Sequence, residues 1–399
     1  MAEQGDNKLQ TAIDRLLPAW REALALRERE AAGGVKFGPS VTSRMNLSAA
    51  LVPSFEAWYG APLDRSMGVG SVVSGRSALR ADAFCWHALD RAAAQGPASG
   101  VTWLKKVLGT KSAAGRIYAE VSGLVATESG NLCQGFDIRP APDVKDDPFE
   151  DPRLSFMPEV GAVVSLAVPP SPFIAPMGGS NLAEVSALNE RLHDLVTALA
   201  LLGGAPRVAM HWFEYDDPDL NLLITRQRIY PFRTGSRFHR PNLDIAAASA
   251  LLTQYGQLGG PTKRSIDLAL DRLVSARIHL WPGDKALDGA IGLEALFGDT
   301  QGEEIGYRIR LRAALFMEDD PGRRATLRAM VGKFYGIRSK VAHGRVSSSA
   351  AGKGDDDAVI SAGLDLVQRA AVKVCQRGAI PDWGDFEISS KPPEPKGSP

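Results

Sequence analysis

Apolar residues recur every three to four positions over residues 8–31 and again over 77–95, which predicts an amphipathic helix in each range. Pro18 lies inside the first range and predicts a kink or a split in that helix. Residues 33–76 are rich in Gly, Pro and Ser, and they predict a linking stretch between the two helices.

Short segments rich in β-branched and aromatic residues follow, and each predicts a β-strand. These segments are residues 115–126, 160–168, 207–215 and 220–230. The last two flank the sequence Asp-Asp-Pro-Asp, which predicts a hairpin connection. A Pro- and Asp-rich loop is predicted over 139–153 and a helix over 184–202. We therefore expect a mixed α/β region over residues 1–240, which can divide into two subdomains near residue 110.

Helical periodicity replaces the strand pattern in the last third of the chain. Five amphipathic helices are predicted, at residues 262–280, 284–297, 303–318, 321–343 and 357–377. Their short connections are typical of an antiparallel bundle. The predicted fold class is therefore α+β, with an all-α domain over residues 244–388. The Pro-rich tail over residues 389–399 is predicted to be disordered.

Composition excludes several classes of protein. The chain has 399 residues, of which 44% are hydrophobic, and its 46 basic residues balance its 46 acidic ones, as in a soluble protein of two or three domains. Three widely spaced cysteines predict neither a disulfide framework nor a metal site. No apolar leader or membrane-length segment occurs, so we expect a cytoplasmic protein without a membrane partner. The nucleophile elbow and phosphate-loop patterns are absent, and no cofactor is predicted.

Three charged residues fall on the apolar faces of predicted helices. At 100° per residue, Arg338 lies within the apolar stripe of its helix, and Glu294 and Arg312 do the same on theirs. A buried charge is costly unless it is paired, so Glu294 and Arg312 are expected to form a structural ion pair. Arg338 then needs another partner, which can be Asp288, solvent or a phosphate group.

His343 is the second candidate residue in this helix. It lies five residues after Arg338 and therefore about 140° further round, so the two side chains converge only at a helix end or between two copies of the chain. Gly344 is a helix stop signal, although a histidine at this position is also typical of an ordinary helix end. Residues 321–345 hold seven basic and no acidic residues, a pattern that suits a polyanion or a solvated face.

The C-terminal third resembles the Apea-like group of the HEPN domain family. The resemblance covers residues 262–380 and leaves the first 240 residues unmatched. It depends on four motifs in order: LDGAIGLEALF with Asp288 and Glu294, YRIRLRAALFM with Arg312, GRRATL with Arg324, and FYGIRSKVAHG with Tyr335, Arg338, Ser339 and His343.

This resemblance implies a HEPN helical bundle that forms a homodimer and cleaves an RNA substrate without a metal. The family signature is an Arg and a His separated by four to six residues, here Arg338 and His343. His343 would exchange protons, and Arg338 would bind phosphoryl oxygens. Ser339 would orient His343 or the substrate, although active members often carry Asn, Asp or His there. The supporting residues are Glu294, Arg312, Asp288 and Tyr335, and the RNA contacts are Lys340, Arg345 and Lys333.

The resemblance also implies an anti-phage defence or toxin-type effector, in which the N-terminal region binds an inhibitory or sensing partner. Residues 224–240 interleave arginine with aromatic residues, so Arg228 is a secondary candidate for RNA contact, while a half-buried strand is the commoner interpretation. The alternative function is a non-catalytic HEPN module that binds RNA or a partner protein. A third possible function is that of a purely structural assembly protein.

Overall fold

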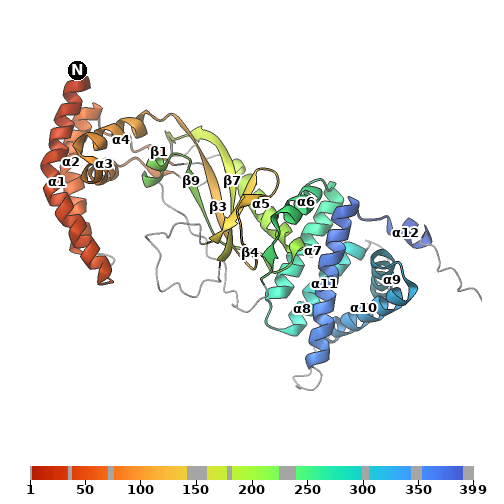
Figure 1. The fold of residues 1–399 in the computed structure, drawn as a ribbon. Helices are drawn as coiled ribbons and strands as arrows, with labels where there is room; N and C mark the ends of the chain where they lie inside the picture. The colour runs from red at the N-terminus through yellow and green to blue at the C-terminus, as the bar shows by residue number, and fades with distance from the viewer. Residues whose placement is uncertain are drawn as a thin grey trace, which may run out of the picture. The chain divides into compact units, whose positions relative to one another are not determined.

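The computed structural model describes residues 2–34, 38–70, 76–141, 160–177, 182–223, 240–298, 305–342 and 353–389. Helices and strands are mixed up to residue 243, and the described residues from 245 to 389 are all helical, which confirms the predicted α+β fold class (Figure 1). The chain divides into two compact units. Unit 1 comprises Met1–Ile117, Ala167–Ala187 and Trp212–Arg228, and unit 2 comprises Tyr118–Leu166, Leu188–His211 and Ile229–Pro399.

Four helices form the first part of unit 1. They are α1 (Ala2–Ala32), α2 (Pro39–Tyr59), α3 (Ala81–Gln95) and α4 (Pro97–Gly109). Their aromatic side chains build the core: Phe55 stacks on Phe84 with ring centroids 6.0 Å apart. The indole Nε1 of Trp20 donates a hydrogen bond to Asp90 over 3.0 Å, which joins α1 to α3. The helix predicted over 8–31 is confirmed, and the one predicted over 77–95 is confirmed from Ala81 onward, because Ser77–Ala78 form a short strand.

Helix α2 contradicts the prediction of a linking stretch over residues 33–76. Pro39 occupies the first turn of α2, where a missing N–H costs no hydrogen bond. Gly60 ends the helix in the left-handed conformation (φ 93°). Leu51 and Phe55 are fully buried, so apolar packing stabilises a helix whose composition is typical of a loop. Pro18 lies within the continuous helix α1, so it does not split that helix.

The strands form two main sheets. In unit 1, β2 (Ser77–Ala78), β1 (Met67–Val69) and β8 (Ile174–Pro176) pair antiparallel in that order. The larger sheet has the order β5-β6-β7-β3-β9, and three of its strands contribute residues to both units. Its strands are β5 (Gly130–Asn131), β6 (Phe136–Pro140), β7 (Val160–Pro172), β3 (Ser112–Ser122) and β9 (Arg207–Tyr215).

The strands predicted over 160–168 and 207–215 are therefore confirmed. The strand predicted over 115–126 is observed as two strands, Ser112–Ser122 and Val125–Ala126, with a break at residues 123–124. The strand predicted over 220–230 is wrong in its first part, because Pro218–Leu223 forms the 3-10 helix η4. Residues 224–230 lie outside the described residues, as does Arg228. The loop predicted over 139–153 begins within β6 and is outside the described residues from 142 onward.

A junction of close backbone contacts lies beside the sheet in unit 2. Strands β4 (Val125–Ala126) and β10 (Asn242–Leu243) pair in parallel there. A Cβ atom at Gly123 would lie 2.1 Å from the carbonyl oxygen of Ala205, and one at Gly204 would lie 2.1 Å from that of Gly123. Neither glycine can carry a side chain in this arrangement.

The predicted helix over 184–202 is confirmed as α5 (Leu182–Ala198) and the 3-10 helix η3 (Leu199–Leu202). Hydrogen bonds join this region to the C-terminal helices: Arg277 donates to the carbonyl oxygen of Gly204 over 2.6 Å and to Gln368 over 2.5 Å. Gln368 in turn donates to the carbonyl oxygen of Leu201 over 3.1 Å. Unit 2 thus combines helices with strands β5 and β6 and with parts of β3, β7 and β9.

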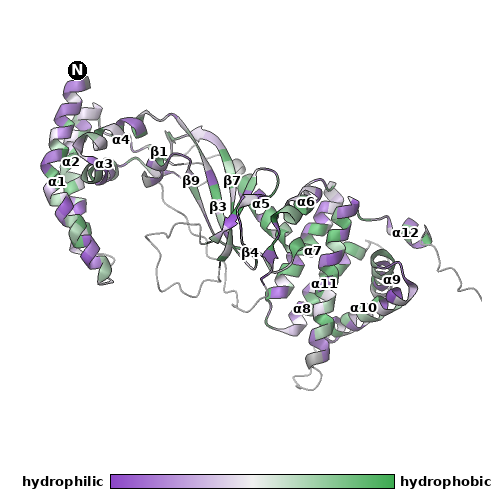
Figure 2. Ribbon diagram, in the orientation of Figure 1, coloured by the Kyte–Doolittle hydropathy of each residue, from purple (hydrophilic) through white to green (hydrophobic). Residues whose placement is uncertain are grey.

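The C-terminal region confirms all five predicted helices and adds two. They are α6 (Ile245–Gly256), α7 (Gly260–Ile278), α8 (Pro282–Phe297), α9 (Ile305–Met317), α10 (Pro321–Ala342), α11 (Lys353–Arg377) and α12 (Trp383–Ser389). Figure 2 shows hydrophobic and hydrophilic residues alternating along these helices, as expected for amphipathic segments. Asp244 caps α6 by accepting a hydrogen bond from the N–H of Ala247 over 3.0 Å. The added helix α12 places Trp383 against Phe297 and Phe316.

No helix in the described ranges combines the length and the apolar character that crossing a membrane requires. Residues 390–399 of the predicted tail lie outside these ranges.

Candidate functional site

Arg338 lies one turn before the end of α10, where the buried stripe of that helix reaches the surface. Leu327, Val331 and Phe334 are buried along this stripe, and Arg338 continues it at helical spacing. Its side chain is nevertheless 39% exposed. The sequence thus placed Arg338 on the correct face, but the guanidinium is only half-buried because it lies near the open end of the helix.

Glu294 of α8 is the carboxylate closest to this guanidinium among the described residues. Its Oε1 lies 3.7 Å from Nη2 of Arg338, and its side chain is 25% exposed. Hydrogen bonds between these groups are normally about 2.7–2.9 Å long, so the two charges attract without a close hydrogen bond. Partial exposure weakens the attraction further. The donors of Arg338 can therefore be taken by another anion.

Tyr335 completes this group of polar side chains. Its hydroxyl lies 3.4 Å from the carbonyl oxygen of Ala290 and 3.5 Å from Oε1 of Glu294, and both contacts are long for a hydrogen bond. Burial raises the pKa of the phenol, and the charge of Glu294 raises it further. Tyr335 therefore keeps its proton at neutral pH and can act only as a neutral donor or acceptor.

The surface around Arg338 is basic. Lys333, Ser339 and Lys340 are exposed on α10. His343 and Arg345 follow Ala342, the last residue of α10, and both lie outside the described residues. The structure thus brings together Arg338, Glu294 and Tyr335, with Ser339 and Lys340 next to them in the chain.

The predicted ion pair between Glu294 and Arg312 is wrong. Arg312 is buried, and its Nε lies 2.6 Å from Oε1 of Glu387. Its Nη1 also donates to the carbonyl oxygen of Phe297 over 2.9 Å. Glu387 belongs to α12, a short helix that sequence periodicity did not reveal. Arg312 therefore joins α9 to α12 and has a structural role away from Glu294.

Asp288 also lies apart from the Arg338 group. Its carboxylate is 2.8 Å from Nε2 of His279 and 3.2 Å from Nη1 of Arg272, both from the α7 side of the bundle. Asp288 and Ala290 differ by about 200° around α8, so they face opposite sides of that helix. No sequence signal pointed to the group formed by Asp288, His279 and Arg272. His279 has no His or Cys neighbour at metal-ligand spacing, and its carboxylate partner belongs to the next helix.

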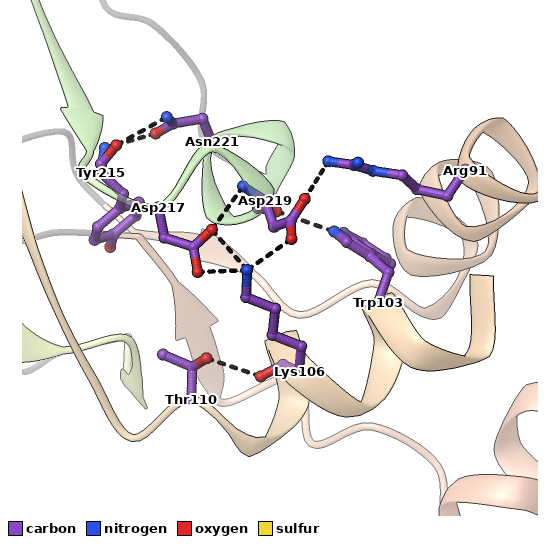
Figure 3. Close-up of polar contacts among 8 residues, drawn as sticks. All are labelled: Arg91, Trp103, Lys106, Thr110, Tyr215, Asp217, Asp219 and Asn221. Atoms are coloured by element: carbon purple, nitrogen blue, oxygen red, sulfur yellow. Dashed lines mark hydrogen bonds and ion pairs between the residues drawn. The ribbon is translucent and has the colours of Figure 1, made fainter. Parts of the chain in front are cut away.

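Unit 1 contains a separate polar network around η4 (Figure 3). The ammonium of Lys106 lies 2.7 Å from a carboxylate oxygen of Asp217 and 2.7 Å from one of Asp219. Asp219 also pairs with Arg91, and its backbone carbonyl accepts a hydrogen bond from Trp103 over 3.1 Å. Acids and bases balance in this network, so it fixes the turn after β9 instead of offering charge to a ligand.

Within the described ranges, no group of three or more His, Cys, Asp or Glu side chains is arranged to hold a metal ion. No protein-family model matches this chain, and no curated protein or solved structure is significantly similar to it. A functional assignment must therefore start from the residues around Arg338.

Proposed function

We propose that the protein is a metal-independent endoribonuclease of the HEPN type that acts as a homodimer. One observation carries the proposal: the half-exposed guanidinium of Arg338 lies near the end of α10, and among the described residues its one ion pair is the long contact with Glu294. Arg338 stands five residues before His343 in the sequence. A guanidinium in this state can bind a phosphate group, and the following histidine supplies a group that exchanges protons near neutral pH.

The reaction needs only these two kinds of group. His343, as general base, removes the proton from a 2'-hydroxyl, and the resulting oxygen attacks the adjacent phosphorus. The bond from phosphorus to the 5'-oxygen breaks, and that oxygen takes a proton from a general acid, which is the second His343 in a homodimer. The products are a 2',3'-cyclic phosphate and a 5'-hydroxyl. Arg338 stabilises the charge that develops on the phosphoryl oxygens.

Charge on α10 supports an RNA substrate. Lys333 and Lys340 are exposed, and residues 321–345 contain no acidic side chain. Such a surface attracts a polyanion through release of its counterions. We further propose a cytoplasmic anti-phage or toxin-type effector whose N-terminal region binds a sensing or inhibitory partner.

The test compares RNA cleavage by the full chain and by two variants in the presence of EDTA. We expect wild type to produce cyclic phosphate ends, and Arg338→Ala and His343→Ala to lose on the order of a hundredfold in rate. Arg323→Ala is the matched control, because it removes an exposed arginine from the other end of α10. Cleavage that requires a metal, or that persists in both variants, would contradict the proposal.

A non-catalytic RNA-binding module is the second candidate function. It is favoured by Ser339, an exposed residue at a position where active HEPN proteins often carry Asn, Asp or His. In that case wild type binds RNA in the same experiment without forming products, and Arg338→Ala weakens binding.

A further inference from the structure

Two ion pairs of the C-terminal helices differ in a way that bears on the role of Glu294. Arg312 and Glu387 meet at 2.6 Å, and the Arg312 side chain is only 4% exposed. Arg338 and Glu294 stay 3.7 Å apart, and both side chains are partly exposed. The first pair is close enough to hold two helices together, whereas the second is too long and too hydrated for that task.

Glu294 also lies within reach of a second partner. Its Oε1 is 3.5 Å from the Tyr335 hydroxyl and 3.7 Å from the Arg338 guanidinium, so the same oxygen faces both groups. A small rotation of the Glu294 side chain can shorten one contact as it lengthens the other. The carboxylate thus has an alternative hydrogen-bond donor when it leaves Arg338.

We propose that Glu294 is a resting counter-ion that competes with an RNA phosphate for Arg338. A phosphodiester, like a carboxylate, presents two oxygens that fit the fork of a guanidinium, so the two anions need the same donors. Their like charges also repel, so RNA binds tightly only after Glu294 turns toward Tyr335. This inference depends on the proposed function for its ligand and adds a residue that opposes binding.

A different role for Glu294 predicts the opposite result. If the carboxylate positions Arg338 for catalysis, its removal leaves the arginine poorly oriented, and RNA binding weakens or stays the same. Glu294→Gln distinguishes the two roles, because it removes the charge while keeping the size of the side chain.

The experiment measures binding separately from cleavage. The probe is a fluorescein-labelled single-stranded oligonucleotide in which every 2'-hydroxyl is methylated, so the nucleophile is blocked, and fluorescence anisotropy gives the Kd. We expect Glu294→Gln to lower the Kd about two- to fivefold, the effect typical of a partly exposed ion pair. Asp319→Asn is the control, because it removes an exposed negative charge next to α10 and should leave the Kd unchanged.

Two further variants make the test specific to Arg338 and Tyr335. In an Arg338→Ala background, Glu294→Gln should no longer improve binding, because the guanidinium for which the carboxylate and the phosphate compete is absent. Tyr335→Phe should weaken binding, because the displaced carboxylate loses its alternative donor. Thermal unfolding of each variant checks that it is folded.

The results separate this inference from the proposed function. If Glu294→Gln binds no better than wild type, or if its gain persists without Arg338, the counter-ion role is overturned while the nuclease proposal stands. If wild type binds the probe but never cuts unmodified RNA, the nuclease proposal fails and the counter-ion role is still decided by the Kd values. If neither wild type nor Glu294→Gln binds the probe, the counter-ion role is overturned for RNA.

Discussion

Gly363 of α11 lies against the ring of Phe334 of α10: a Cβ atom on this glycine would be 2.6 Å from Cδ2 and 2.7 Å from Cε2 of the ring. Gly289 of α8 approaches the same ring, and a Cβ there would be 2.9 Å from Cζ. Phe334 is fully buried. Three helices therefore meet at one aromatic ring, and this contact fixes α10 four residues before Arg338.

The Gly363→Ala variant should be destabilised. The added methyl group would overlap a fully buried ring, which typically costs about 1–3 kcal/mol. Gly336→Ala is the matched control, because no atom lies within 4 Å of a Cβ there and α10 should gain up to about 1 kcal/mol from the better helix former. Urea denaturation followed by circular dichroism measures both. Equal stability of the two variants would contradict this packing.

The ion pairs Arg312–Glu387 and Arg338–Glu294 should respond differently to loss of the acid. Glu387→Gln should lower the free energy of unfolding by about 1–3 kcal/mol, because it leaves the buried Arg312 with a weaker partner. Glu294→Gln should change it by less than about 1 kcal/mol, because its pair is long and partly exposed. Urea denaturation tests the order of the two values, and a larger loss in Glu294→Gln would contradict it.

Acid should weaken the network around η4. Partial burial acts to raise the pKa of Asp217, but hydrogen bonds from Lys106 and from the N–H of Asp219 outweigh it and leave the pKa below its ordinary value of 3.8. Its contribution to stability is therefore present above about pH 4 and is lost as the pH falls through the lower folded value. Hydrogen bonds to Asp217 and then Asp219 raise the pKa of Lys106, so its contribution is lost only in strong base.

The check is the thermal midpoint of Asp217→Asn and of wild type at several pH values. We expect the variant to be less stable by about 1 kcal/mol or less at pH 7, and the difference to shrink as the pH falls below 3.8. A difference that grows as the pH falls would contradict the sign of the shift.

His87 should make the protein sensitive to mild acid. Burial lowers the pKa of its imidazole below the ordinary value of 6.5, and the nearby charges of Arg44 and Arg91 add to this effect while Asp90 opposes it. The unfolded chain therefore binds a proton near pH 6.5 that the folded chain binds only at lower pH, so stability falls as the pH drops below 6.5. Thermal midpoints between pH 8 and pH 5 should fall less steeply for His87→Asn than for wild type.

Long amphipathic patterns were the most reliable guide to the fold. The five helices between residues 260 and 377 were predicted because each shows several turns of the same apolar spacing. The errors in α2 and η4 have a different origin. Helix α2 depends on burial of Leu51 and Phe55 by other helices, and η4 depends on charges from α3 and α4 that are about a hundred residues away. Local sequence contains neither kind of information.

The candidate site was predicted in part for the same reason. Helical spacing placed Arg338 and Glu294 on inward faces, and the structure brings these two residues together. The spacing did not show which helix faces which. Arg312 was therefore given the wrong partner, because Glu387 lies on a helix of only seven residues. Asp288 was predicted as one alternative partner of Arg338, but its carboxylate pairs with Arg272 and His279.

The hydrogen bonds of Arg277 have a practical consequence for dissecting this molecule. A fragment that begins at residue 244 would contain every C-terminal helix, yet it would deprive Arg277 of the Gly204 carbonyl and Gln368 of the Leu201 carbonyl. Both side chains would then face water on a surface that is covered in the whole protein. Truncation studies should therefore retain η3 and the turn that follows it, because Gly204 and Leu201 supply acceptors to side chains that come 73 and 167 residues later in the chain.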